Sequence, residues 1–424
     1  MELGPPRGTQ DLLPPAGSRM RALYDRAAEL ARAYGYRYVE TPTFESTELF
    51  ARTSGETSDV VSKEMYSFVD RGDRMLTLRP EGTAPVMRAY LHQRQRLGVP
   101  FKGYYLTRMF RYSRPQAGRY REHRQFGIEV FAVEAPTADV EVIEVADAFL
   151  RSLGLERYRL ELNSIGDEVC RPAYRELLLE YLRSRRDDLR DEHRFRFEEN
   201  PLRVLDCKDE ACRKVAAGAP MMVDHLCDAC RAHFDAVVDG VRAADLQPVM
   251  TPTLVRGLDF YTRTAFEFVS EAMQDTGNAQ QSTLFGGGRY DGLAETLGGP
   301  RVPGVGFGMG LERVLIALDD EGIEPPEEPP IAVFVVALGD AARETGRGLV
   351  RELRAAGVSA DIAYEDRPLK AQLKMADHAG ARFAAIVGER ELAEGAVTLR
   401  RLADGEQESV QVDRLAARLD GENG

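Results

Sequence analysis

The sequence predicts an α+β protein built on an antiparallel sheet with flanking helices, interrupted by a helical insertion and followed by a small α/β domain. Short apolar runs lie close together in the first 162 residues, and the apolar spacing becomes helical between residues 167 and 248. A proline-rich linker then precedes alternating strand and helix patterns. We therefore expect a main domain over residues 1–325, an insertion over residues 167–248 within it, and a C-terminal domain over residues 331–424.

The first elements follow from periodicity. Apolar residues at 20, 23, 24, 27, 30, 31 and 34 predict a helix, with Ser18 as N-cap and Gly35 as C-terminal stop. Strand-like runs come next, and the turns that join some of them favour antiparallel pairing. These runs are Tyr36–Pro42, Met75–Arg79, Gly103–Phe110, Phe126–Val133 and Tyr158–Leu162.

The chain changes character from Asp167 to about Pro248, where charges cluster and the apolar spacing becomes helical. This stretch predicts an inserted helical subdomain. Strand-like runs return at Leu254–Val269 and Val305–Met309, and a helix is expected at 311–320.

The clearest boundary is the linker over residues 322–330, whose four prolines stiffen it and prevent a helix from continuing. Beyond it, Ile331–Leu338 fits a buried strand. A helix, a strand at Val358–Ala363, another helix, a strand at Arg382–Val387 and a hairpin at Asp404-Gly405 are expected to follow. This order predicts a small α/β domain.

Composition excludes several classes of protein. The net charge of −13 argues against a protein that coats nucleic acid nonspecifically, although a local basic site remains compatible with it. We find no 18-residue apolar run and no apolar core of a signal peptide at the N-terminus. We therefore expect a cytoplasmic protein that makes no contact with a membrane.

Four of the cysteines form Cys-x4-Cys and Cys-x2-Cys pairs within the expected insertion, and four thiolates so spaced suit a structural zinc ion. The alternative is four reduced thiols in a small helical subdomain, so we assign no metal ligand from the sequence. The residues concerned are Cys207, Cys212, Cys227 and Cys230.

The segment Leu254–Tyr261 places one arginine and one aspartate in an otherwise apolar run. A buried cation needs an anionic partner. Arg256 therefore either forms a structural pair with Asp259 or faces an anionic substrate, and the pattern alone leaves both open.

The segment Arg108–Arg124 is strongly basic, with six arginines against one glutamate and a net charge of +5. Pro115 and Gly118 mark a turn between two strand-like runs, so we expect a hairpin with a basic loop. Like charges so concentrated favour binding of a polyphosphate or a nucleic-acid end over a solvated, salt-bridged loop.

Glycines at 304, 306, 308 and 310 do not form a dinucleotide fingerprint, because Met309 and Leu311 stand where glycine is required. The sequence also contains no Gly-Lys dipeptide and hence no P-loop. We expect these glycines to lie beneath a flat ligand.

Gly286–Gly292 is expected to be flexible. Carboxylates at 81, 129 and 259 together predict a polar pocket, and even spacing places Gln125 and Glu129 on one strand face.

These residues together resemble the histidyl-tRNA synthetase family of class II aminoacyl-tRNA synthetases, over nearly the whole chain. Three segments are similar to the class motifs, and two are similar to motifs of the histidine enzymes. The class segments are Glu40 to Phe68, Phe110 to Glu129 and Gly306–Arg313, and the histidine-type segments are Leu254–Tyr261 and Gly287–Gly292.

The resemblance implies roles for individual residues. Arg111 would hold the α-phosphate of ATP, and Arg119 and Arg313 its β/γ end, with Mg²⁺ sharing the charge. Arg256 would bridge the substrate carboxylate and the α-phosphate as the second catalytic arginine beside Arg111. The histidine-binding set would be Glu81, Thr83 and Gln125 at the α-ammonium, Glu129 and Tyr261 at the imidazole nitrogens, and Tyr290 along the pocket.

The resemblance also implies the partners: L-histidine, ATP, tRNA(His) and a second copy of the chain in a homodimer. Gln116 would meet the first base pair of the acceptor stem, and residues 331–424 would bind the anticodon. The motif around His123 and Arg124 departs from the family pattern. A histidine-sensing regulatory relative shares the fold, but it typically lacks the C-terminal domain and the arginine-bearing motif, so the resemblance favours the enzyme.

Overall fold

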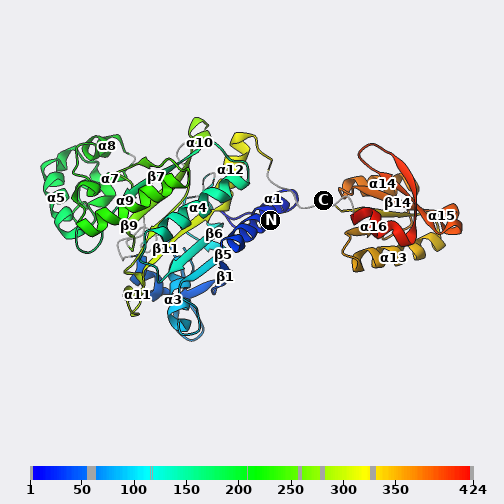
Figure 1. Cartoon of the computed structure of the whole chain (residues 1–424), viewed down its shortest axis with the longest axis horizontal. Helices are drawn as coiled ribbons and strands as arrows, with labels where there is room; N and C mark the ends of the chain where they lie inside the picture. Colours follow the sequence, from blue (N-terminus) through cyan, green and yellow to red (C-terminus); the bar gives the residue numbers. More distant parts are fainter. Residues whose placement is uncertain are drawn as a thin grey trace. The chain divides into compact units, whose positions relative to one another are not determined.

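The computed structural model describes residues 3–54, 64–114, 116, 118–207, 209–255, 260–276, 282–324 and 331–420 (Figure 1). It divides into two compact units, Met1–Glu327 and Glu328–Gly424. Each unit has its own sheet and its own hydrophobic core.

An eight-stranded sheet forms the centre of the first unit. Its strand order is β1-β5-β6-β11-β10-β9-β7-β8. The bounds are β1 Arg37–Tyr38, β5 Phe101–Phe110, β6 Glu122–Phe131, β7 Tyr158–Ser164, β8 Val249–Met250, β9 Thr262–Ser270, β10 Thr283–Arg289 and β11 Gly304–Gly310. The expected fold class is confirmed, since the six inner strands pair antiparallel.

The two edges of this sheet differ from the expectation, because β1 pairs with β5, and β7 with β8, in parallel. Parallel neighbours require a long connection between them. Both edge pairs have one, and the insertion supplies it for β7 and β8. Short apolar runs show where strands lie but not the direction in which distant strands meet.

One face of the sheet is covered by helices α1 Ala16–Ala33, α4 Thr137–Ser152, α9 Asp228–Ala243 and α12 Leu311–Glu321. Phe126, Ile128 and Phe307 of the sheet enter the same core as Phe149 of α4 and Val314 of α12. Helix α1 begins before Ser18, and the N-cap position belongs to Pro15. Proline suits the first turn because the missing N–H would have no helical partner there.

The opposite face of the sheet carries the polar residues, because side chains alternate along each strand. Gln125 and Glu129 of β6 lie on this face, beside Gly306 and Gly308 of β11. The expectation of a flexible segment at Gly286–Gly292 is wrong, since β10 extends to Arg289 and pairs on both sides. These glycines give room to neighbours on both faces, since a Cβ at Gly287 would approach Phe266 and Phe307 and one at Gly288 would approach Tyr261.

A three-stranded sheet of order β2-β4-β3 lies beside helix α3 in sequence and completes the N-terminal half. Its members are β2 Phe44–Ser46, β3 Tyr66–Val69 and β4 Met75–Leu78. The neighbouring helices are α2 Thr47–Ser54 and α3 Thr83–Gln93, and two short ones, α10 Glu271–Asp275 and α11 Leu293–Thr296, flank β10 in the chain. The N-terminus of α3 points polar groups toward the sheet, as described below.

The helical insertion lies between β7 and β8 and has a small core of its own that includes Tyr174, Leu178, Leu182 and Val215. Its helices are α5 Arg171–Ser184, α6 Asp191–Arg194, α7 Leu202–Leu205, α8 Glu210–Ala216 and α9. Helix α9 contributes Cys230, near its start, to the core of the insertion, and Phe234, Val237 and Val241, further along, to the core of the main sheet. It therefore joins the insertion to the main sheet.

The second unit is a five-stranded sheet of order β13-β12-β14-β15-β16, with β13, β12 and β14 parallel and the last two antiparallel. The strands are β12 Val333–Ala337, β13 Ala360–Ile362, β14 Phe383–Val387, β15 Ala396–Arg401 and β16 Gln407–Gln411. The helices are α13 Asp340–Ala355, α14 Leu369–His378, α15 Glu389–Glu394 and α16 Leu415–Asp420. The hairpin turns at Asp404-Gly405, as expected.

Of the helices in the described ranges, none is long and apolar enough to cross a lipid bilayer.

Candidate active site

A buried carboxylate, Glu129, lies at the centre of a cluster of buried and half-buried side chains on the face of the sheet opposite the main core. We name this cluster of Glu81, Thr83, Glu129, Tyr261 and Tyr290 the carboxylate pocket. The side chain of Glu129 is 0% exposed. Oε1 accepts hydrogen bonds from the hydroxyls of Thr83 at 2.8 Å and Tyr105 at 3.3 Å, and Oε2 accepts one from the hydroxyl of Tyr290. Three hydroxyl groups from three elements therefore fix the orientation of this carboxylate.

A second buried carboxylate, Glu81, lies at the start of α3. It accepts hydrogen bonds from the backbone N–H groups of Thr83 at 2.6 Å and Ala84 at 3.1 Å. These N–H groups lack helical partners, so Glu81 acts as a cap where the helix dipole favours negative charge. The same turn brings the Thr83 hydroxyl to Glu129.

Burial raises the pKa of Glu81 to about 7 and that of Glu129 to about 8. Among the residues that the structure describes, neither carboxylate forms an ion pair with a cationic side chain. A buried carboxylate without a protein cation is stabilised by a ligand that brings positive charge or N–H donors. The pocket therefore suits a cationic or hydrogen-bonding small molecule.

Aromatic rings form the walls of this pocket. Tyr261, just before β9, and Tyr290, just after β10, lie with ring centroids 6.1 Å apart. The ring of Phe260 lies 4.9 Å from that of Tyr261 and 5.6 Å from that of Tyr290. All three side chains are buried. At these separations the rings contact one another, so together they form one aromatic wall against which a flat ligand can pack.

The floor of the pocket is glycine backbone from β11, and Gln125 lies directly on it. A Cβ atom built at Gly308 would lie 1.6 Å from Nε2 of Gln125. Because real atoms never approach so closely, only glycine at 308 lets the amide occupy this position. Gln125 lies on the same face as Glu129, as the even spacing predicted.

A second part of the site is a cavity of about 350 Å³ that is lined by Arg111, Arg119 and Arg313 and also by Gln125. Gln125 lines this cavity and lies on the same strand face as Glu129, so the cavity adjoins the carboxylate pocket. Burial, followed by the charges of Arg119 and Arg111, lowers the pKa of Arg313. The cavity therefore presents three guanidinium groups to a polyanion, with Glu267 and Glu312 also in its lining.

His123 also lines this cavity and stays neutral. Burial, followed by the charges of Arg111 and Arg313, lowers the pKa of His123 to about 3. A neutral imidazole adds a hydrogen-bonding group without adding a fourth positive charge.

Backbone carbonyls and one carboxylate hold the arginines in place. Arg313 donates to the carbonyl oxygens of Gly118 at 3.3 Å and Thr283 at 2.6 Å. Nε of Arg111 donates to the carbonyl of Pro80 at 2.7 Å, and the side chain of Arg119 pairs with Glu64 at 2.6 Å. The guanidinium groups are thus aimed into the cavity before any ligand binds.

Two buried arginines, Arg124 and Arg289, form structural ion pairs. Arg124 pairs with Glu312 at 3.2 Å, and both are buried. Arg289 is 0% exposed and pairs with Asp139 and, at 3.1 Å, with Asp291. The hairpin and the end of β10 are therefore fixed by these pairs.

Gln116 is exposed at the tip of the β5–β6 hairpin loop, where its backbone pairs with that of Arg119. Arg256 and Asp259 lie outside the described residues, so the choice between an internal pair and a substrate contact stays a hypothesis.

Comparison with known proteins decides the family. The protein-family model for histidyl-tRNA synthetase matches residues 8–187, and the family model for the anticodon binding domain matches residues 332–422. The histidine–tRNA ligase of Moorella thermoacetica is 50% identical over 416 residues, which cover 98% of this chain and 96% of the relative. That of Rhodococcus erythropolis is 48% identical over 417 residues, with the same coverage of 98% and 96%.

The chain belongs to the histidyl-tRNA synthetase family. The crystal structure of apo histidyl-tRNA synthetase from S. aureus superposes with a TM-score of 0.82 at 36% identity and covers 99% of this chain and 100% of that chain. Because this coverage extends over both compact units, membership of the histidyl-tRNA synthetase family applies to the whole chain.

Three residues of this histidyl-tRNA synthetase-type site were missed from the sequence. Tyr105 binds Glu129, His123 lines the arginine cavity, and Glu64 holds Arg119. Tyr105 lies opposite Gly127, between Gln125 and Glu129 on the neighbouring strand. Strand alternation would have identified it only if the register of β5 with β6 had been known. Glu64 has no comparable sequence signal.

The Cys-x4-Cys and Cys-x2-Cys pairs do not come together in the single four-thiolate group that their spacing suggested. Cys227 and Cys230 lie with Cys170 and Asp167, whereas Cys207 and Cys212 lie with His193. The Cys-x4-Cys and Cys-x2-Cys pairs are held by different parts of the insertion, α7–α8 and the start of α9. Spacing in the sequence did not reveal that separation.

Proposed function

We propose that this chain ligates L-histidine to tRNA(His) in two steps, with ATP consumed in the first. Histidine and ATP form histidyl-adenylate and pyrophosphate, and the histidyl group then passes to the 3′-terminal adenosine of the tRNA with release of AMP. One observation carries the proposal: Gln125 lines the arginine-lined cavity and lies on the same strand face as the buried carboxylate Glu129. An amino acid and a polyphosphate can therefore meet at one point.

The carboxylate pocket would select histidine. A neutral imidazole has one N–H donor and one acceptor nitrogen. Glu129 accepts from the donor and the hydroxyl of Tyr261 donates to the acceptor, while Tyr290 lines the pocket and holds Glu129. Apolar analogues would leave these buried groups unpaired, so discrimination by roughly 10⁴ or more is expected without an editing site.

The α-ammonium group of histidine would bind at the other end of the pocket, between Glu81, Thr83 and Gln125. Glu81 is buried and near the N-terminus of α3, where it already accepts two backbone N–H bonds. A bound ammonium would stabilise its ionised form and lower its pKa from about 7.

The arginine cavity would hold ATP, with Arg111 at the α-phosphate and Arg119 and Arg313 at the β/γ end. Glu267 also lines the cavity and offers the oxygen ligand that Mg²⁺ prefers. When bound, Mg²⁺ neutralises phosphate charge. The residues of the chain supply orientation, because three anchored guanidinium groups fix the triphosphate against the pocket.

The chemical step needs no general base, because the histidine carboxylate is already ionised when it attacks the α-phosphorus. Negative charge grows on the five-coordinate centre, and a fixed guanidinium stabilises it more in the transition state than in the ground state. We assign this role to Arg111 and to Arg256.

The remaining partners follow the same proposal. Gln116, exposed at the hairpin tip, would meet the first base pair of the acceptor stem. Residues 1–325 would form the catalytic domain, with 167–248 inserted, and residues 331–424 would bind the anticodon. The enzyme would act as a homodimer in the cytoplasm.

Histidine-dependent exchange of pyrophosphate into ATP tests this proposal. We expect exchange with histidine and Mg²⁺, and Arg256→Ala to slow it by about 10²–10³-fold in a folded protein, as for loss of one transition-state donor. A protein that binds histidine but shows no exchange is instead a histidine-sensing regulatory relative. An Arg256→Ala variant that fails to fold would assign Arg256 to an internal pair.

A further inference from the structure

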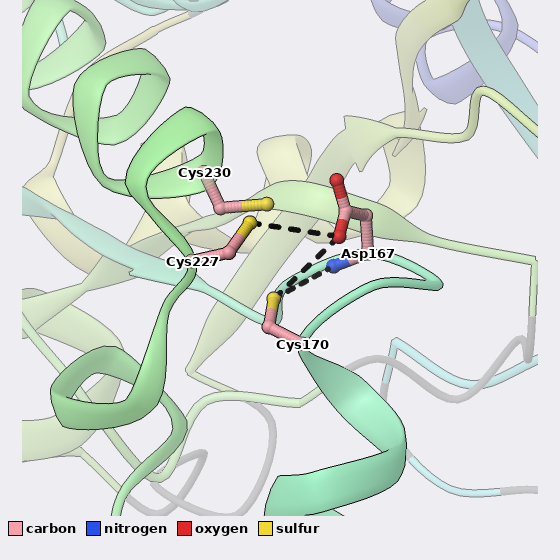
Figure 2. A group of neighbouring side chains, drawn as sticks. All are labelled: Asp167, Cys170, Cys227 and Cys230. Carbon is pink, nitrogen blue, oxygen red and sulfur yellow. Dashed lines mark hydrogen bonds between the residues drawn. The ribbon is translucent and has the colours of Figure 1, made fainter.

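A group of four potential metal ligands joins the two ends of the helical insertion. Asp167 follows β7, Cys170 immediately precedes α5, and Cys227 and Cys230 lie at the start of α9. Figure 2 shows the four side chains converging from these three segments. One ligand atom from each lies within 4.8 Å of every other. We propose that these four residues bind one structural Zn²⁺ ion.

The distances suit a tetrahedral zinc site. Bonds of about 2.3 Å to sulfur and 2.0–2.2 Å to oxygen place neighbouring sulfur and oxygen ligands about 3.6 Å apart. Oδ1 of Asp167 lies 3.5 Å from Sγ of Cys170 and 4.0 Å from Sγ of Cys227. Zinc can therefore be bound with side-chain adjustments of a few tenths of an ångström at these contacts.

The ligand set selects zinc by its chemistry. Three thiolates and one carboxylate complete a four-coordinate shell, and a closed shell is typical of a structural rather than a catalytic zinc ion. The two pairs also have the same spacing, Asp-x2-Cys and Cys-x2-Cys. All five cysteines are free thiols, so no disulfide competes for these sulfurs.

The surroundings are already arranged around these ligands. The backbone N–H of Asp167 donates to Sγ of Cys170 at 3.4 Å, and the N–H of Val169 donates to Oδ1 of Asp167 at 3.0 Å. Gly166 has φ +64°, and a Cβ there would lie 2.8 Å from Sγ of Cys170. Glycine is therefore required for the backbone to turn beside this sulfur.

Charge supports the same assignment. Three thiolates and a carboxylate around Zn²⁺ carry a net charge of −2, and Arg263 offsets part of it by pairing with Oδ2 of Asp167 at 3.3 Å. Asp167, Cys170 and Cys230 are buried. With protonated sulfurs, Cys170 and Cys227 donate hydrogen bonds to Oδ1 of Asp167, and Zn²⁺ would take the place of these protons.

The site also connects the insertion to the histidine pocket. Arg263 lies two residues after Tyr261, and Nη2 of Arg171, the first residue of α5, donates to the carbonyl of Tyr261. Zinc would thus fix α5 and α9 against the segment that carries Tyr261, just before β9. Its primary effect is on folding of this junction, and the proposal does not depend on the catalytic one.

The test is metal analysis of the full chain, produced without a histidine tag. We expect one zinc ion per chain, lost in a Cys227→Ser/Cys230→Ser variant and kept in a Cys207→Ser/Cys212→Ser control. Zinc that persists in the first variant, or disappears from the control alone, overturns the proposal. So does reduced metal-free protein that takes up no Zn²⁺ in competition with a chromophoric chelator.

X-ray absorption of the zinc-loaded wild-type chain decides the matter if the serine variants do not fold. We expect three sulfur neighbours at about 2.3 Å and one oxygen at about 2.0–2.2 Å. Four sulfur neighbours, or a nitrogen from histidine, would overturn this ligand set. Loss of zinc with histidine-dependent exchange retained would leave the catalytic proposal intact, so the two proposals fail separately.

Discussion

Gly308→Ala should damage histidine binding without damaging the fold. The added methyl group would lie 1.6 Å from Nε2 of Gln125 and 2.8 Å from its Cδ, and the nearest atoms all belong to that one side chain. To reach ordinary van der Waals contact, the amide must move by about 2 Å. Gln125 has a flexible side chain, so the backbone of β11 can stay in place while the amide leaves the pocket floor.

The magnitude follows from the interaction that is lost. A hydrogen bond to a charged group such as the α-ammonium contributes about 1.5–3 kcal/mol. The KM for histidine should therefore rise roughly 10- to 150-fold. Stability should change little, because alanine also restricts the unfolded chain by about 0.4–1 kcal/mol relative to glycine.

The assay is pyrophosphate exchange at varied histidine, with thermal unfolding measured in parallel. Gly292→Ala is the matched control, since a Cβ there meets nothing within 4 Å. Gln125→Ala should raise the KM to a similar extent, and adding Gly308→Ala to it should cause little further change. A Gly308→Ala variant whose KM for histidine stays within about threefold of the wild type would refute the assignment of Gln125 to the amino acid.

Three further predictions follow from buried charges. Because the pKa of Glu129 is raised from 4.5 to about 8, its contribution to stability is fully present below pH 4.5 and is lost as pH rises to about 8. In the wild type, the free energy of unfolding should fall with pH over that range by at most about 1.4 kcal/mol per pH unit, and Glu129→Gln should remove this slope. Urea unfolding at pH 5, 6.5 and 8 measures it, and an unchanged slope in the variant would contradict the burial argument. Arg313→Ala should raise the KM for ATP roughly 10- to 150-fold and change the KM for histidine less, in the same exchange assay; equal effects on both would mean that Arg313 does not serve the phosphates. Asp139→Ala should destabilise the chain by about 3–5 kcal/mol in urea unfolding, because it leaves Arg289 buried beside a weaker set of partners; a loss below about 1 kcal/mol would show that Asp291 and the nearby carbonyls suffice.

Much of the fold could be predicted because its signals are local. The helix at Ala16–Ala33 and strands such as Phe101–Phe110 follow from periodicities of 3.6 and 2 residues. The direction of the edge pairs, β1 with β5 and β7 with β8, could not be predicted, because it depends on where distant segments meet. The three glycines at 286–288 misled for a different reason: glycine normally weakens a strand, but here two neighbouring strands hold it in place.

The candidate site divides in the same way. Gln125 and Glu129 could be paired from their even spacing on one strand. Tyr105 could not be added without the register between strands, nor could Glu64, which reaches Arg119 from a distant part of the chain. The cysteines show the limit most clearly: Cys170 and Asp167 lie 57 or more residues before Cys227 in sequence, yet they share its group.

The parallel pairing of β7 with β8 has a consequence for the insertion between them. Glu161 lies opposite Val249, so the insertion leaves and rejoins the sheet at adjacent strands running the same way. Such a crossover needs only a dozen or so residues. Helices α5–α8 are therefore more than this connection requires, and they pack around a hydrophobic core of their own. We therefore expect the outer helices of the insertion to tolerate changes of length and sequence without any shift in the register of β7 with β8.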